Sequence, residues 1–109
     1  LINYFKSILQ INTEIVFSSN LDIKSTGSQK LYEICKELKA DTYLSGELGK
    51  NYLDLEIFKN NNIKIIFEKF QHPTYSQINS NFLPNMSIMD LLFNEGNNSI
   101  DILKKCKNY

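Results

Sequence analysis

The stretch "TGSQKLYEICKELKADTYLSG", residues 26–46, contains the pattern that decides the fold. Its apolar residues recur three and four positions apart, as on one face of an amphipathic helix. They are Leu31, Ile34, Cys35 and Leu38. Thr26 and Gln29 have the spacing of a capping box, which predicts that the helix begins at Thr26. Residues 41–46 then predict a short strand that ends at Gly46, so a helix leads directly into a strand.

The alternation of helix and strand continues after residue 46. The segment "YLDLEIFKNNN", residues 52–62, predicts a brief helix with Asp54 as its N-cap. In "IKIIFEKF", residues 63–70, apolar and charged residues alternate, which is typical of a strand with one face more exposed to solvent. Residues 86–96 and 99–107 predict two further helices, capped by Ser87 and Ser99.

The residues before this stretch follow the same alternation. "LINYFKSILQI", residues 1–11, has the spacing of an amphipathic helix, and "TEIVFSS", residues 13–19, predicts a buried strand. The whole order predicts an α/β fold, a three-layer sandwich with a short parallel sheet of about three strands, flanking helices and a C-terminal helical pair. We expect residues 1–109 to form a single domain. Because the chain begins inside an apolar helical pattern, we also expect this domain to be the C-terminal part of a longer protein.

The composition restricts the classes of function. The chain is 42% hydrophobic and 22% charged, as in ordinary globular proteins. Twelve basic residues, all lysine, balance twelve acidic residues, which argues against a nucleic-acid-binding protein. No apolar run has the length of a membrane span and no signal-peptide pattern is present, so we expect a cytoplasmic protein. Two cysteines, Cys35 and Cys106, are too few for a disulfide scaffold and fit buried apolar positions.

Polar loops follow each predicted strand, at residues 18–28, 45–52 and 71–81. The carboxyl ends of parallel strands lie at one edge of a sheet, where ligands bind in such folds. The helix start at residues 26–28 offers backbone N–H groups to an anion, and the alternative is a simple helix cap. Gly46, Gly49 and Lys50 form either a turn that contacts an anionic ligand or only a tight turn. The sequence identifies no cofactor.

His72 is the only histidine, and it lies between Gln71 and Pro73. Its ordinary pKa near neutrality suits general acid–base chemistry. A second metal-ligating histidine and a complete nucleophile–base–orienter triad are both missing, so we expect no metal site. On the residues alone, His72 is either a working group or the residue that ends a strand before Pro73.

The segment from Gly27 to Gly96 resembles the C-terminal half of the WbqC-like protein family. The similar motifs are Thr-Gly-Ser at 26–28, Tyr-Leu-Ser-Gly at 43–46, Tyr-Leu-Asp at 52–54, His-Pro-x-Tyr-x-Gln at 72–77 and Ser-Ile-x-Asp-Leu-Leu-Phe-Asn at 87–94. The resemblance implies a catalytic role for His72. It implies substrate contacts for twelve further residues: Thr26, Gly27, Ser28, Ser45, Gly46, Gly49, Tyr52, Asp54, Tyr75, Gln77, Asp90 and Asn94. An N-terminal His-Gln-Pro segment found in the family has no counterpart in this chain.

The resemblance also implies a function. It suggests a bacterial protein of surface-polysaccharide (O-antigen) synthesis, acting as a transferase that moves an aminoacyl group such as glycine, or a similar group, onto a sugar. The ligand would be a sugar, a nucleotide-sugar or another anionic small molecule. The alternatives are a non-catalytic α/β binding or interaction module and an inactive truncated family member. The partner of this chain would be a second copy or the missing N-terminal half.

Overall fold

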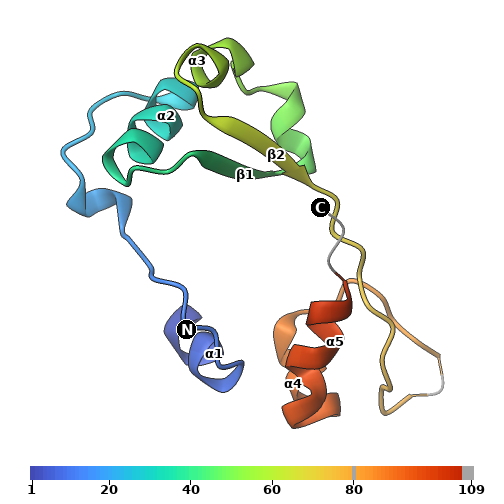
Figure 1. Ribbon diagram of the computed structural model, residues 1–109. Helices are drawn as coiled ribbons and strands as arrows, with labels where there is room; N and C mark the ends of the chain where they lie inside the picture. Colours follow the sequence, from blue (N-terminus) through green and yellow to red (C-terminus); the bar gives the residue numbers. More distant parts are fainter. Residues whose placement is uncertain (80, 107–109) are drawn as a thin grey trace. The chain divides into compact units, whose positions relative to one another are not determined.

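The computed structural model describes residues 1–79 and 81–106 (Figure 1). They form two compact units. One unit consists of residues 15–69, and the described part of the other consists of residues 1–14, 70–79 and 81–106.

The unit of residues 15–69 is a small α/β arrangement. Its elements are η1 (Ser18–Asn20), α2 (Gly27–Glu37), β1 (Thr42–Gly46), η2 (Glu47–Asn51), α3 (Leu55–Asn60) and β2 (Lys64–Glu68). The two strands are parallel, and their register runs from Thr42 opposite Lys64 to Gly46 opposite Glu68. Helices α2 and α3 lie on the same side of this sheet (Figure 1). The α/β class and the parallel pairing predicted from the sequence are therefore confirmed.

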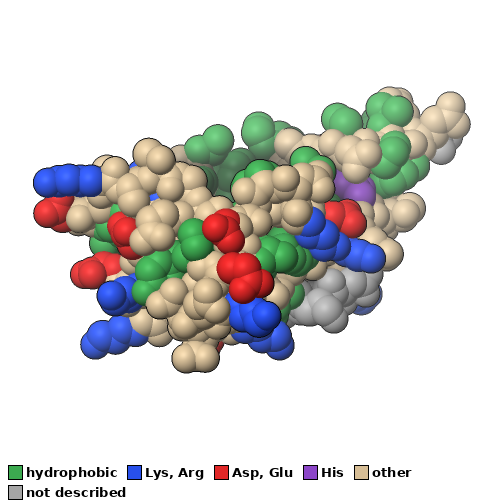
Figure 2. All heavy atoms as spheres, turned by 90° about the horizontal axis from the view of Figure 1, so that it is seen from above, with side chains coloured by type: hydrophobic (Ala, Val, Ile, Leu, Met, Phe, Trp, Pro, Cys, Tyr) green, Lys and Arg blue, Asp and Glu red, His purple; other side chains and the backbone are tan. Residues whose placement is uncertain are grey.

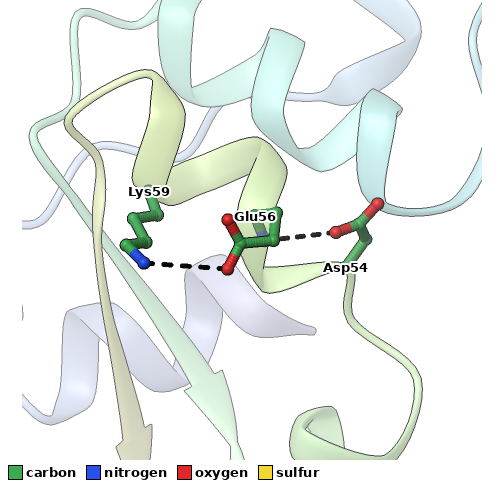
Figure 3. Close-up of polar contacts among 3 residues, drawn as sticks. All are labelled: Asp54, Glu56 and Lys59. Carbon is green, nitrogen blue, oxygen red and sulfur yellow. Dashed lines mark hydrogen bonds and ion pairs between the residues drawn. The ribbon is translucent and has the colours of Figure 1, made fainter.

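The core of this unit lies between the sheet and the two helices. Its buried residues are Cys35, Leu53, Phe58 and Ile63. Because residues paired across parallel strands point to the same side, Tyr43 and Ile65 both pack against this core. The Tyr43 ring stacks on Phe58, with 5.4 Å between centroids. Helix α3 begins as predicted, since Asp54 Oδ1 accepts a hydrogen bond from the Glu56 backbone N–H at 3.1 Å (Figure 3).

The predicted third strand is wrong. Residues 11–17 have no regular secondary structure, and the apolar run Ile15, Val16 and Phe17 is 37%, 42% and 61% exposed. A strand needs a neighbouring backbone to accept and donate its hydrogen bonds, and an apolar composition does not supply one. Within the described residues the sheet has two strands, so the three-layer arrangement is not formed.

The capping box predicted at the start of α2 is also wrong. Thr26 does precede the helix in an extended conformation, but its side chain makes no capping hydrogen bond. The Gln29 amide donates instead to Glu33 Oε1 one turn further on, at 2.8 Å. Gly27 has a φ of +58°, a conformation that favours glycine over residues with a Cβ.

The second unit is helical. Its elements are α1 (Ile2–Ile8), α4 (Ile88–Glu95), η3 (Gly96–Asn98) and α5 (Ser99–Lys105). Ser87 caps α4 as predicted, because its Oγ accepts from the Met89 N–H at 3.2 Å, and Gly96 ends this helix at a φ of +50°. Residues 69–79 and 81–86, where a long loop is predicted before α4, form neither helix nor strand.

Ser99 is not the N-cap of α5, contrary to the prediction. Asn98 takes that position, and Ser99 is the first helical residue, with 0% of its surface exposed. Its Oγ contacts the carbonyl oxygens of Gly96 at 2.7 Å and Leu91 at 3.3 Å. A short 3₁₀ turn joins α4 directly to α5, so the Ser99 hydroxyl satisfies carbonyl groups at the end of α4.

Two further properties concern the described part of the chain. None of the helices formed by residues 1–79 and 81–106 has the length and apolar character needed to cross a bilayer. Lysine and acidic side chains are interspersed over the face seen in Figure 2, rather than gathered by sign.

Candidate functional site

His72 lies in a cluster of aromatic rings within the helical unit. Its ring centroid is 6.2 Å from that of Phe70, 5.9 Å from Tyr75 and 6.0 Å from Phe82. The Nδ1 atom is buried and has no hydrogen-bond partner among residues 1–79 and 81–106. The side chain as a whole is half-buried, and part of it is visible at the surface in Figure 2 (purple). His72 therefore combines a buried, unpaired nitrogen with access from outside.

A pocket of about 250 Å³ adjoins His72. Its apolar lining comes from the loop, α4 and α5: Phe70, Pro73, Tyr75, Ile88, Leu91 and Leu103. The Met86 side chain adds to this lining, and the polar residues are His72 and Ser87. A mostly apolar cavity with a few polar groups is the usual form of a small-molecule site.

Asp90 holds the loop against α4. Its Oδ2 accepts hydrogen bonds from the Tyr75 hydroxyl at 2.7 Å and from the Gln77 amide at 2.9 Å. These two bonds lower the pKa of the Asp90 carboxyl below its ordinary value, since they stabilise the charged form. Burial, and then the bond to Asp90, raise the pKa of the Tyr75 hydroxyl. Asn94 donates to the Asp90 backbone carbonyl at 2.8 Å, so it supports the helix.

Gln77 closes the loop on itself. Its Oε1 accepts from the Leu83 backbone N–H at 2.8 Å, and its Nε2 donates to the Leu83 carbonyl at 3.0 Å. The Ser76 backbone N–H donates to Glu95 Oε1 at 2.9 Å. The polar groups of Tyr75 and Gln77 are thus used within the protein, and Tyr75 also lines the pocket beside His72.

The other predicted site residues belong to the unit of residues 15–69. Ser28, in the first turn of α2, accepts a hydrogen bond from the Asp54 backbone N–H at 2.9 Å, so the starts of α2 and α3 are joined. The carboxylate of Asp54 is used as the α3 cap. Further along α3, Glu56 and Lys59 form an exposed ion pair at 3.8 Å (Figure 3).

The turn after β1 brings three predicted residues together. Ser45 is buried, with 4% of its surface exposed, and its Oγ donates to the Gly46 carbonyl at 3.1 Å. Gly49 approaches so closely that a Cβ there would overlap the Ser45 Oγ. Tyr52, directly after this turn, is 69% exposed.

The predicted site residues are therefore divided between the two units. His72, Tyr75, Gln77, Asp90 and Asn94 are together in the helical unit, whereas the remaining eight lie in residues 15–69. Sequence reasoning missed Phe70 and Phe82, whose rings flank His72, although the aromatic content of the loop was a signal. Within the described ranges, no group of three or more His, Cys, Asp or Glu side chains is arranged to hold a metal ion.

Comparison with known proteins identifies the family. The sequence model of the WbqC-like protein family matches residues 1–102. The chain belongs to the WbqC-like family. It is also similar to "Uncharacterized protein Rv1507c" of Mycobacterium tuberculosis (strain ATCC 25618 / H37Rv), with 31% identity over 108 residues. That match covers 98% of this chain and 47% of the relative, so the chain spans about half the length of this relative. No solved structure matches the chain significantly.

Proposed function

We propose that this chain is the C-terminal part of a WbqC-like transferase of bacterial surface-polysaccharide synthesis, and that the pocket beside His72 receives one of the reactants. The observation that carries the proposal is that His72 lines an accessible pocket, with an Nδ1 that is buried and has no hydrogen-bond partner among residues 1–79 and 81–106. Buried polar atoms without partners are rare, and those that occur are often explained by a functional role. A cytoplasmic location fits a reaction that uses an activated donor.

In the proposed reaction, a sugar hydroxyl attacks the carbonyl carbon of an activated aminoacyl donor. A new C–O ester bond forms, the bond between that carbonyl carbon and the leaving group breaks, and the hydroxyl proton passes to an imidazole nitrogen of His72. The proton then leaves with the departing group. Proton transfer by a positioned side chain contributes roughly 10²–10⁴-fold to a rate.

In the unit of residues 15–69, the proposal keeps the substrate contacts that the family resemblance suggests. They involve the α2 start at 26–28 and the turn of Ser45, Gly46 and Gly49, followed by Tyr52 and Asp54. The contacts within the helical unit favour a narrower role for Tyr75, Gln77 and Asp90. Because Asp90 accepts from both Tyr75 and Gln77, these bonds hold Tyr75, which lines the pocket, in place beside His72.

The test is a transfer assay with glycine activated as a thioester and N-acetylglucosamine as the acceptor, with the product measured by mass spectrometry. We expect His72→Ala and His72→Gln to lower the rate by about 10²–10⁴-fold, since neither variant accepts a proton. His72→Gln retains hydrogen bonding, so it separates proton transfer from binding. Unchanged transfer by both variants would contradict the catalytic role.

A non-catalytic binding module is the second candidate. It is favoured by one observation: the polar groups of Tyr75 and Gln77 bond to Asp90 and Leu83, so these side chains hold the loop together rather than face a substrate. In this case the wild-type protein binds a ligand in the pocket but forms no transfer product.

A further inference from the structure

The pocket beside His72 offers very few polar groups to a ligand. Among residues 1–79 and 81–106, its polar lining residues are His72 and Ser87, and neither lysine nor an acidic residue lines it. The Tyr75 hydroxyl is bonded to Asp90, and the Ser87 Oγ already accepts from the Met89 N–H. Among the side chains of the described residues, a ligand in this pocket therefore meets one imidazole and one partly used hydroxyl.

This polar content does not suit a sugar ring or a phosphate group. Each hydroxyl or anionic oxygen that leaves water without a partner costs free energy. A phosphate is usually matched by cationic side chains, and the part of the chain that the structure describes places none in the lining. The Asp90 carboxylate, 2.7 Å from the Tyr75 hydroxyl, also makes this wall unfavourable for an anion.

From these contacts we infer that the pocket binds an uncharged and mainly apolar part of a ligand. This part is a short alkyl or aryl chain that ends in a single hydroxyl. The inference rests on the proposal that a reactant enters this pocket, and it names the chemical class of the part that enters. The volume is sufficient, because a cavity of about 150 Å³ holds benzene and this pocket has about 250 Å³. His72 is the hydrogen-bonding partner of the terminal hydroxyl, which is the group that gives up its proton in the proposed transfer, and the sugar ring or phosphate part of the same reactant lies outside.

The experiment uses the imidazole signal of His72, which is unambiguous because the chain has one histidine. The ¹H–¹³C signal of the ring is followed at fixed pH while benzyl alcohol, benzoate, N-acetylglucosamine or inorganic phosphate is added to the full chain. We expect the His72 signal to shift to saturation as benzyl alcohol is added. Benzoate, N-acetylglucosamine and phosphate should each bind at least threefold more weakly than benzyl alcohol. A larger response to benzoate, the sugar or phosphate would overturn the inference, as would no response to any probe.

A matched pair of variants locates the binding. Phe70 lines the pocket and is 58% exposed, whereas Phe93 is 85% exposed and does not line it, so neither change removes a buried core residue. We expect Phe70→Ala to weaken benzyl alcohol binding at least threefold and Phe93→Ala to leave it unchanged. Equal effects of the two variants would overturn the inference. Transfer activity without benzyl alcohol binding would contradict this inference alone, whereas benzyl alcohol binding without transfer would contradict the proposed transferase alone.

Discussion

Gly49→Ala tests the close approach in the turn after β1. A Cβ at residue 49 would overlap the Ser45 Oγ and lie 3.1 Å from Leu53 Cδ1 and 3.2 Å from Phe67 Cε1. Ser45 and Leu53 are 4% and 8% exposed, so neither side chain has free space beside it. Inserting a methyl group into a packed site costs about 1–3 kcal/mol. Alanine also restricts the unfolded chain more than glycine does, which offsets about 0.4–1 kcal/mol of that cost. We therefore expect the free energy of unfolding to fall by about 0.5–2 kcal/mol.

Gly46→Ala is the control for this prediction. Gly46 lies three residues earlier with a φ of −65°, and a Cβ there meets no atom within 4 Å. Alanine adopts this conformation without strain, so we expect the free energy of unfolding to stay the same or rise by up to about 1 kcal/mol. The two glycine substitutions should therefore have opposite signs.

The assay is urea unfolding, followed by NMR signals of residues 15–69 so that the result reports on this unit. A double-mutant cycle with Ser45→Ala removes the overlapping oxygen. In that background we expect Gly49→Ala to cost about 0.5–1.5 kcal/mol less, while contacts with Leu53 and Phe67 preserve part of the loss. If Gly49→Ala is as well tolerated as Gly46→Ala, or if the cycle shows no coupling, the packing explanation is refuted.

Three further predictions concern the core, a helix cap and the pocket wall. Phe58→Ala should destabilise the unit of residues 15–69 by about 3–5 kcal/mol, because Phe58 is 0% exposed; urea unfolding measures this, and a loss below about 1 kcal/mol would contradict it. Asp54→Ala should cost about 1 kcal/mol by removing the α3 cap, and Asp54→Asn, which still accepts the Glu56 N–H, should recover most of it in the same assay. The pKa of Asp90 is lower in the folded protein than the ordinary carboxyl value of about 3.9. The charged carboxylate therefore stabilises the fold fully above that ordinary value, and this stabilisation is lost as the pH falls through the lower folded-state pKa. Amide exchange at Ser76 and Leu83 should rise in that acid range in the wild type, whereas Asp90→Asn should show faster exchange at neutral pH and no such rise.

The parts of the fold that depend on neighbouring residues could be predicted from the sequence. Asp54 caps α3 and Ser87 caps α4, because a cap and the helix it serves lie within three residues of each other. Ile15, Val16 and Phe17 have the composition of a strand but do not form one. Strand formation depends on a distant backbone partner, and local composition carries no information about it.

The same distinction applies to the candidate site. His72 and its loop could be identified from residue type and from the position after β2. The bond from Tyr75 to Asp90 joins residues fifteen positions apart, and the two bonds between Gln77 and Leu83 depend on how the loop closes. From the sequence, Tyr75 and Gln77 appeared free to contact a substrate, whereas in the structure both bond to Asp90.

The central claim is that the pocket beside His72 is where a ligand binds. The most direct measurement is the set of intermolecular nuclear Overhauser effects between benzyl alcohol and the protein at saturation. Binding in this pocket predicts contacts from the aromatic protons of benzyl alcohol to the His72 ring and to the methyl groups of Met86 and Leu103. Contacts confined to the other apolar surface of this unit, at Tyr4 and Phe93, would contradict the claim.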